Sequence, residues 1–257
     1  MELFFRKFGV APRSIVIFHG LFGSSDNWLT QARLLEDMYS VYLVDQRNHG
    51  LSPKSEVHTY DLLADDMYRF LEQHALMGSV VIGHSMGGKA VMKFVQKFPD
   101  AIAAAIIVDI APKRYDPQHD HILDGLKSIP VETVTSRNQA DELLTPYVPQ
   151  PGVRQFLLKN LQRKPEGGFQ WKINLPVLDN SIEVISDGPD ATVPFHQPTL
   201  FIRGSKSDYV LDEDMATIAR HFPAYQLVTL EAGHWVQAEV PDAFVDAVKS
   251  FLKSIDY

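Results

Sequence analysis

The chain contains no cysteine among its 257 residues. Disulfide bonds, thiolate metal ligands and cysteine nucleophiles are therefore excluded. The chain also lacks an excess of basic residues, because 24 lysines and arginines stand against 32 aspartates and glutamates, for a formal net charge of −8. A general nucleic-acid-binding protein presents a basic face, so this charge balance argues against nucleic acid as a partner.

Long apolar segments are missing as well. The longest apolar stretch, AIAAAIIV at residues 101–108, is too short to span a bilayer. The start of the chain, MELFFRKFGVAPRS, has no long apolar run followed by a small-residue cleavage site, as a secretory signal would have. The sequence therefore predicts a cytoplasmic protein without membrane insertion. Hydrophobic residues still make up 45% of the composition, which is enough to bury a sizeable core.

Short runs of branched apolar residues alternate with segments of helical period. Six runs predict strands, and their nearly continuous apolar character is typical of a parallel sheet buried on both faces: 14–18, 40–44, 79–83, 104–108, 199–203 and 226–230. Helices are predicted where apolar residues recur every three or four positions: 60–76, 86–98 and 241–255. This alternation predicts an α/β fold, with an open, mostly parallel sheet between two layers of helices.

The alternation is interrupted between about residues 113 and 196. This interval holds several prolines, polar turns and short helical patterns such as VRQFLLKNL at 153–161, and PTLFIRG then resumes the strand pattern. It has no linker composition and returns to the same sheet. We therefore expect a core of residues 1–112 and 197–257, with residues 113–196 inserted between late strands as a helical cap. A separate linked domain is the alternative.

The most specific motif is Gly83-His84-Ser85-Met86-Gly87. It lies between a predicted strand and a predicted helix, which is the context that a G-x-S-x-G nucleophile elbow requires. The turn is so tight that the neighbours of the serine must be small. It also exposes the serine at a helix N-terminus, where amides and the helix dipole favour developing negative charge. Ser85 is therefore the candidate nucleophile.

The same stretch overlaps a second pattern. GHSMGGK, from Gly83 to Lys89, also fits the G-x-x-x-x-G-K loop that cradles phosphates in nucleotide hydrolases. That motif continues with serine or threonine to hold magnesium, whereas the next residue here is Ala90. The stretch also follows the third predicted strand instead of opening the fold. The elbow interpretation is therefore favoured over nucleotide binding.

A serine needs a base to become nucleophilic. His234, in EAGHWVQAEVPDAF, follows the last predicted strand and so lies at the same sheet edge as Ser85. It also comes last in the chain, as in the order serine, acid, histidine. His84 adjoins the serine, but successive side chains diverge at such a turn, so we expect a structural role for it. The HDH segment at 119–121 lacks a third ligand at zinc spacing and is expected to be a solvated part of the cap.

Acyl transfer also needs donors for an oxyanion. IVIFHGLFGSSDNW places Leu21 and Phe22 just after the first long strand, and the glycine before them lets the backbone turn the next amide into the site. The N–H groups of Leu21 and of Met86, the residue after the nucleophile, form the candidate oxyanion hole. A plain strand-end turn is the alternative.

These motifs give the chain a resemblance to the α/β-hydrolase superfamily, and within it to the bacterial YbfF-type esterases. HGLFGS, VDQRNHGLS, GHSMGGKAVM, VDIAP and AGHWVQAEVP carry the likeness, which spans nearly the whole chain outside the cap. Assignment to the esterase branch rests mainly on RNHGLS and VDIAP together. The resemblance implies an α/β-hydrolase fold and carboxylic ester substrates, with acyl-CoA thioesters as a further class.

Two carboxylates compete for the position of the catalytic acid. The superfamily pattern G-x-x-D-x-x-V, laid on GSKSDYV with Gly204 and Val210 in register, puts Ser207 where the acid is expected and Asp208 one residue late. Asp109 in IIVDIAP ends the preceding strand at the same sheet edge, and the esterases that this chain resembles carry their acid there. Both placements keep the chain order. The register favours Asp109, with Asp208 as the alternative and Ser207 as a hydrogen-bond partner.

The resulting hypothesis is a serine hydrolase that cleaves esters of small to medium acyl chains through an acyl-enzyme, with no metal or organic cofactor. Ser85 would attack the carbonyl, His234 would take the proton, and Asp109 would hold the imidazole. The partner is therefore a small-molecule acyl substrate.

Substrate choice is expected to come from the cap together with Phe22, Lys89, Trp171 and Ser207. Two alternatives share the predicted fold: a cofactor-free C–C bond hydrolase or lyase, and a perhydrolase. A third alternative, of a different class, is a catalytically silent α/β-hydrolase that binds a ligand, and the intact serine and histidine argue against it.

Overall fold

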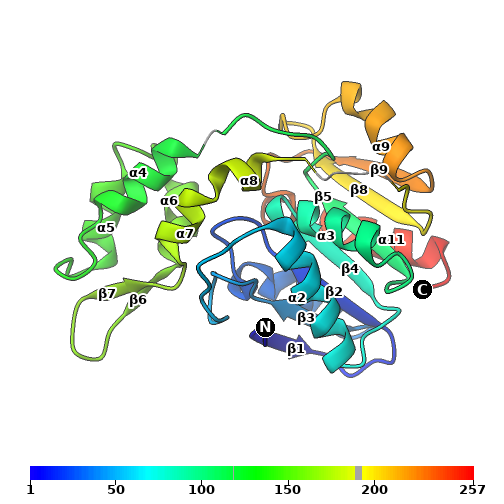
Figure 1. Ribbon diagram of the computed structural model, residues 1–257, viewed down its shortest axis with the longest axis horizontal. Coiled ribbons are helices and arrows are strands. Elements are labelled where there is room, and N and C mark those ends of the chain that lie inside the picture. The colour runs from blue at the N-terminus through cyan, green and yellow to red at the C-terminus, as the bar shows by residue number, and fades with distance from the viewer. Residues whose placement is uncertain (118, 189–192) are drawn as a thin grey trace.

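The protein is built on a seven-stranded sheet, seen in a computed structural model that describes residues 1–117, 119–188 and 193–257 (Figure 1). Within these residues the strand order is β1-β3-β2-β4-β5-β8-β9. β1 runs antiparallel to β3, and the other neighbours are parallel. The strands are β1 (Phe5–Phe8), β2 (Ser14–Phe18), β3 (Ser40–Val44), β4 (Val80–His84), β5 (Ala104–Val108), β8 (Thr199–Gly204) and β9 (Tyr225–Leu230).

Helices cover both faces of this sheet. One face packs against α2 (Tyr60–Gln73), α3 (Met86–Lys97) and α9 (Met215–His221), and the other against α1 (Leu29–Leu35), α10 (Val236–Glu239) and α11 (Pro241–Ser254). Successive side chains of a strand point to opposite faces. In β4, Val81 therefore joins the first core while Val80 and Ile82 join the second. Both faces are buried, which explains the continuous apolar runs in the sequence.

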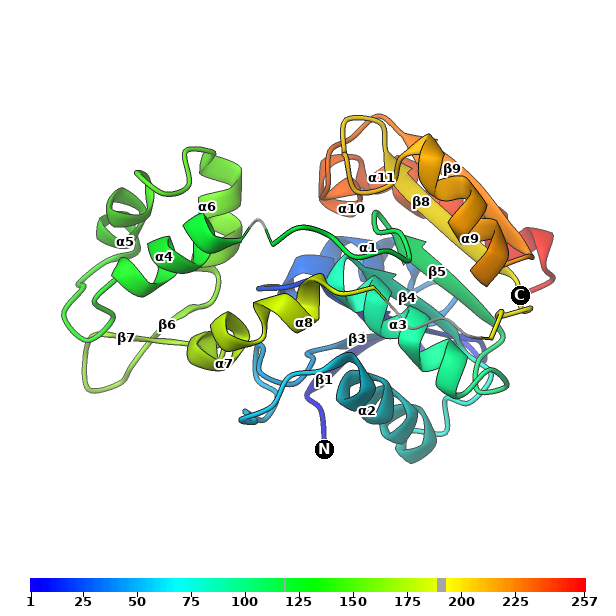
Figure 2. The same cartoon turned by 45° about the horizontal axis from the view of Figure 1, so that its top comes forward.

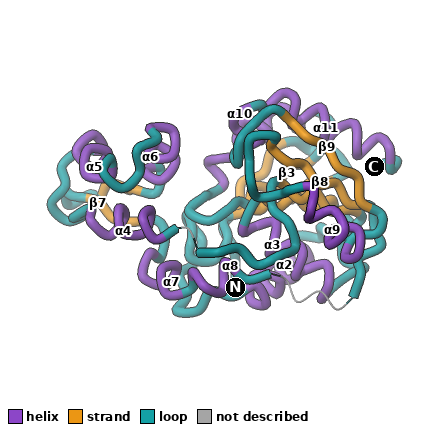
Figure 3. The backbone as a smooth tube through the Cα atoms, turned by 90° about the horizontal axis from the view of Figure 1, so that it is seen from above, coloured by secondary structure: helices purple, strands orange, loops and turns teal. Residues whose placement is uncertain are grey.

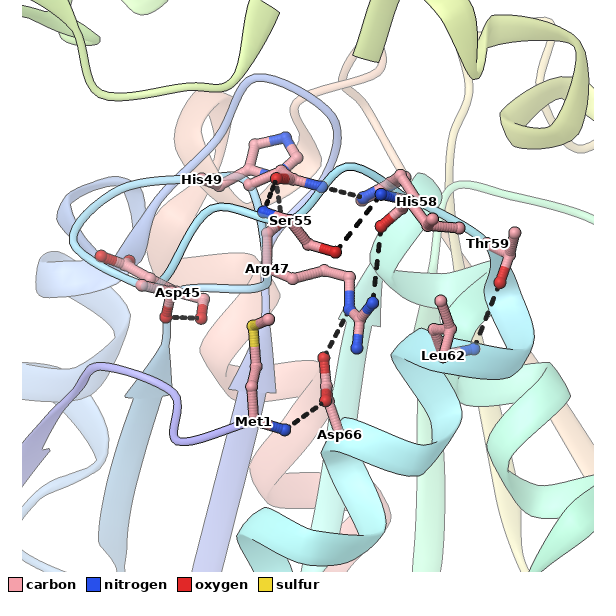
Figure 4. Close-up of polar contacts among 12 residues, drawn as sticks. Met1, Asp45, Arg47, His49, Ser55, His58, Thr59, Leu62 and Asp66 are labelled. Carbon is pink, nitrogen blue, oxygen red and sulfur yellow. Dashed lines mark hydrogen bonds and ion pairs between the residues drawn. The ribbon is translucent and has the colours of Figure 1, made fainter. Parts of the chain in front are cut away.

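Helix α2 shows how local sequence sets an element in this fold. Thr59 is its N-cap, and the Thr59 hydroxyl accepts a hydrogen bond from the amide of Leu62 at 3.4 Å (Figure 4). Leu63, Met67 and Phe70 follow at spacings of four and three and are buried against the sheet. The helix is therefore fixed by a polar cap at its start and an apolar stripe along one face.

Between β5 and β8 the chain leaves the sheet. Figures 1 and 2 show most of this insertion as a group of helices and a hairpin beside the sheet, with α8 leading back toward α3. Figure 3 shows the same grouping from above. The elements are α4 (Asp120–Ser128), α5 (Arg137–Leu144), α6 (Pro151–Leu158), β6 (Leu161–Arg163), β7 (Phe169–Trp171), α7 (Leu175–Asn180) and α8 (Ile182–Ser186).

The predicted fold class is confirmed, with six strands and three helices close to their expected bounds. The edge strand β1 and the β6–β7 hairpin were not predicted. The boundaries of the cap at 113 and 196 stay a prediction, and residues 118 and 189–192 of that interval lie outside the described residues. Among the described residues, no helix combines the length and the apolar character needed to cross a bilayer.

Candidate active site

Ser85 stands in a strained turn between β4 and α3. Its backbone has φ 54° and ψ −121°, a region that residues with a side chain rarely adopt, and its amide donates to the carbonyl of Val108 at 3.0 Å. Glycines on either side are required by close packing. A Cβ on Gly83 would collide with the carbonyl of Gly87, and a Cβ on Gly87 would collide with the carbonyl of His19. The elbow geometry expected from the motif is therefore present.

Three side chains from distant parts of the chain meet at the carboxyl edge of the sheet. His234 Nε2 lies 3.0 Å from Ser85 Oγ, and His234 Nδ1 lies 2.8 Å from Asp109 Oδ2. A carboxylate accepts only, so Nδ1 carries the proton and Nε2 is free to accept from the serine hydroxyl. This is the tautomer that a general base needs. The structure thus brings together the nucleophile, base and acid favoured by the sequence, and their catalytic roles stay predictions.

Asp109, the favoured acid, is completely buried and held by two further donors. Its Oδ1 accepts from the amide of Gly204 at 2.9 Å, and its Oδ2 accepts from the hydroxyl of Ser207. Asp208 is exposed and makes no hydrogen bond to His234 among the described residues. Ser207, which stands at the expected acid position in GSKSDYV, therefore lies against the Asp109 carboxylate. Ser207 is a partner of Asp109 and lines neither cavity described below.

The ring of Tyr209 fixes the other side of the base. It stacks on the His234 imidazole with ring centroids 4.0 Å apart and an interplanar angle of 22°. His84 donates from Nε2 to the His234 carbonyl at 2.9 Å. Sequence reasoning expected a structural role for His84 and missed Tyr209, since stacking across a loop leaves no local motif.

The two residues expected to supply the oxyanion amides lie beside the serine. Leu21 and Met86 both line the cavity around Ser85. Met86 begins α3, so its amide has no acceptor within the helix. The next amide along the first loop, that of Phe22, donates to His49 Nε2 at 3.2 Å, and Phe22 has a positive φ of 59°. This contact fixes the turn that follows Leu21. The oxyanion role stays a prediction.

His49 belongs to RNHGLS, whose backbone is itself anchored. His49 Nδ1 donates to the carbonyl of Arg47 at 3.0 Å, and Arg47 Nε donates to Asp66 Oδ2 on α2 at 2.6 Å. Figure 4 shows Arg47 pointing toward Asp66 while the ring of His49 points away from it. RNHGLS, one of the motifs that suggested an esterase branch, therefore links α2 to the candidate oxyanion loop through Arg47 and His49.

Several histidines around this loop are held neutral by burial. Burial lowers the pKa of His19 to about 4 and lowers the pKa of His49, His58 and His84 to about 3. Neutral rings serve as paired donor and acceptor. His19, for example, donates from Nδ1 to the Gly20 carbonyl at 2.8 Å and accepts at Nε2 from the Gln46 amide at 3.0 Å.

These buried rings make stability depend on pH. Unfolding returns each lowered pKa to about 6.5, so below that pH the unfolded chain binds protons that the folded chain does not. We expect the free energy of unfolding to fall from pH 7 to pH 5 by up to about 1.4 kcal/mol per pH unit for each ring. Urea unfolding at both pH values measures this, above the range where ordinary carboxylates titrate.

His58→Gln is expected to make the fall shallower, whereas the same replacement at the exposed His121 leaves it unchanged. A free energy of unfolding that does not change between pH 7 and pH 5 would contradict the prediction.

The side chain of Lys89 makes hydrogen bonds within the protein. Its Nζ donates to three backbone carbonyls where α8 ends, those of Ile185 at 3.3 Å, Ser186 at 2.8 Å and Asp187 at 2.5 Å. Burial lowers the pKa of Lys89 to about 7, and the Asp187 carboxylate partly opposes this. Three N–H groups on three carbonyls match an ammonium group. Lys89 therefore ties α3 to the returning end of the cap, and its ammonium is not free for a substrate.

Lys89→Met is expected to lower the free energy of unfolding by about 1–3 kcal/mol, because it removes the donor to the Asp187 carbonyl and one of two donors to each of the Ile185 and Ser186 carbonyls. Lys93→Met on the same helix is the matched control. Lys93 makes one ion pair with an exposed partner, Asp61, at 3.4 Å, so its loss should change stability by less than about 0.5 kcal/mol. Urea unfolding of both variants measures the difference, and equal effects would refute the anchoring role.

Two cavities open from Ser85. A small one of about 100 Å³ runs beside Met86 and Lys89, and a large one of about 800 Å³ runs beside Phe22 toward α6 and α10. Trp171 lies on the β6–β7 hairpin and lines neither, so the structure does not bring it to the site.

His119 corrects another expectation. It is half-buried and lines both cavities, with a pKa lowered to about 4 chiefly by burial, so the prediction of a solvated segment is wrong for this residue.

The chain belongs to the alpha/beta hydrolase fold family, whose profile matches residues 13–241. It is 38% identical over 249 residues to a mouse protein named sn-1-specific diacylglycerol lipase ABHD11, covering 93% of this chain and 80% of that protein. It is also 38% identical over 240 residues to esterase YbfF of Escherichia coli K12, covering 93% and 92%. Among solved structures, a marine microorganism esterase superimposes with a TM-score of 0.95 at 40% identity, covering 98% and 99% of the two chains. The predicted resemblance is confirmed.

Proposed function

We propose that this protein is a serine hydrolase that cleaves carboxylic esters. The observation that carries the proposal is the continuous hydrogen-bonded line from Ser85 Oγ through the His234 imidazole to the buried Asp109 carboxylate. The names of its relatives, esterase and diacylglycerol lipase, agree with this reaction class. Acyl-CoA thioesters are a further substrate class, because the same attack on a thioester releases a thiol.

In the proposed reaction, Ser85 Oγ attacks the ester carbonyl while His234 Nε2 takes the hydroxyl proton. Asp109 accepts the Nδ1 hydrogen bond and stabilises the imidazolium that forms. The amides of Leu21 and Met86 stabilise the oxyanion. His234 then protonates the leaving alkoxide, and the alcohol departs. Water, activated by the same histidine, attacks the acyl-enzyme and releases the acid.

The proposal is tested by incubating the protein with p-nitrophenyl butyrate and, in parallel, with a fluorophosphonate probe. We expect release of p-nitrophenol together with stoichiometric labelling of Ser85. Labelling without turnover of esters or thioesters would favour the C–C bond hydrolase or perhydrolase alternatives. If the probe does not label the protein and no ester or thioester is turned over, a catalytically silent ligand-binding protein is favoured.

A further inference from the structure

The two cavities meet at the candidate nucleophile but differ in size and lining. Four residues line both of them: Leu21, Ser85, His119 and Tyr209. The large cavity has about eight times the volume of the small one, 800 Å³ against 100 Å³. An ester bound with its carbonyl carbon at Ser85 would therefore send its two halves into two unequal spaces.

The position of the histidine decides which half goes where. The leaving oxygen must lie near His234 Nε2, since this nitrogen protonates it. His234 and Trp235 line the large cavity and not the small one. The carbonyl oxygen is taken by the amides of Leu21 and Met86, and Met86 lines only the small cavity. The alcohol half is thus directed toward the large cavity, which leaves the small cavity for the acyl half.

Resting on the function proposed above, we propose that the small cavity is the acyl site and the large cavity the alcohol site, so that the preferred substrates are short-chain acyl esters of bulky apolar alcohols. In the first step the bond from Ser85 Oγ to the acyl carbon forms, the acyl carbon–alkoxy oxygen bond breaks, and the serine proton leaves on the alcohol through His234. The bulky alcohol is released from the large cavity, and a short acyl group stays on the serine until water removes it.

The small cavity limits acyl length. Each water-sized group needs roughly 10–15 Å³ of such space, so the small cavity of about 100 Å³ holds at most about ten of them. Its walls are large side chains, and Tyr60, Met86, Ile110 and Ile185 are among those that are buried. Dodecanoyl and longer chains exceed this space.

The large cavity suits an apolar alcohol. Phe156 on α6 and Trp235 beside α10 pack against each other in its lining, with ring centroids 5.8 Å apart and ring planes tilted by 54°. Phe22, Trp28 and Val153 add further apolar surface. Burying a long or aromatic alcohol against these side chains contributes about 0.8 kcal/mol per methylene, which raises kcat/KM as long as binding is not saturated.

Two ester series test the assignment on the wild-type protein. The first keeps p-nitrophenol and lengthens the acyl chain from acetate through butyrate to dodecanoate. We expect kcat/KM to be highest at acetate to butyrate and about 100-fold lower at dodecanoate. The second keeps the acetyl group and lengthens the alcohol from ethanol through butanol to hexanol, which are nearly equal as leaving groups. Here kcat/KM should rise about tenfold or more. The reverse pattern, or a flat response in both series, overturns the assignment.

Two substitutions address the cavities separately. Ile185→Ala removes side-chain volume from the small cavity while its backbone carbonyl stays, so the ratio of octanoate to acetate turnover should rise about tenfold. Val153→Trp on α6 fills part of the large cavity, so the ratio of hexyl to ethyl acetate turnover should fall about tenfold. Val10→Trp, at a position that is 93% exposed, should change neither ratio.

The outcomes separate this inference from the proposed function. Ester turnover and Ser85 labelling with the opposite length preference would overturn only the cavity assignment. If the wild-type protein shows neither ester turnover nor labelling of Ser85, the proposed ester hydrolase function is overturned, and the cavity assignment with it.

Discussion

Replacing Ser85 with alanine is expected to lower kcat for p-nitrophenyl butyrate by about 10⁶-fold, the scale seen when a serine nucleophile is removed from a working triad. The variant keeps the oxyanion amides and the cavities, so substrate binding should change little. Steady-state kinetics at pH 7.5 measures both parameters. Ser205→Ala, at an exposed serine of the same sheet edge, is the matched control and should retain wild-type rates.

Residual activity above about 1% in Ser85→Ala, with unchanged unfolding by urea, would mean that another group attacks the ester. Ser85→Ala is expected to fold normally, because the close packing of the elbow depends on Gly83 and Gly87, which the variant keeps. The same urea measurement distinguishes activity lost with the nucleophile from activity lost because the variant does not fold.

Asp109→Asn is expected to reduce kcat by about 10⁴-fold. Asparagine presents an amide where His234 Nδ1 now meets a carboxylate at 2.8 Å, so the imidazole is no longer held in the tautomer that accepts the serine proton, and the imidazolium loses its counter-charge. Asp208→Asn is the matched comparison. Asp208 sits at the rim of the small cavity without a bond to the histidine, so its replacement should cost less than about tenfold.

The comparison between these two variants decides the acid. A larger loss in Asp208→Asn than in Asp109→Asn would mean that the loop after β8 rearranges to bring Asp208 to the histidine. Because Asp109 also accepts from Gly204 and Ser207, its variant needs a stability measurement beside the kinetics. A drop in kcat with the folded state intact is the expected result.

Much of the core and site follows from local sequence. Strands buried on both faces are apolar along their length, and the elbow is a tight turn whose steric demands allow only glycine two positions before and two positions after the serine. The edge strand β1 escaped prediction because its side chains, FRKF, alternate little and are only half-buried. The β6–β7 hairpin has three residues in each strand, too few for a periodic signal.

Contacts between residues far apart in the chain could not be predicted from the sequence. Lys89 carries the charge expected of a substrate-binding residue, but its partners lie nearly a hundred positions further along the chain, at Ile185 to Asp187. His119 looked like part of a solvated run, and only the folded cap turns it toward Ser85. The acid could be argued from register because that register is local, being fixed by Gly204 and Val210 on either side of Ser207.

The insertion between β5 and β8 has a consequence for how such a protein diversifies. These two strands are hydrogen-bonded neighbours, with Ala105 opposite Thr199 and Val108 opposite Ile202. Because the two strands are parallel, the chain leaves at the carboxyl end of β5 and rejoins at the amino end of β8, and the insertion lies within the crossover that joins the two edges of the sheet. Insertions, deletions or whole-segment exchange there can remodel the cavity walls while Asp109, immediately after β5, keeps its place. Specificity and chemistry are thus free to evolve at different rates within one gene.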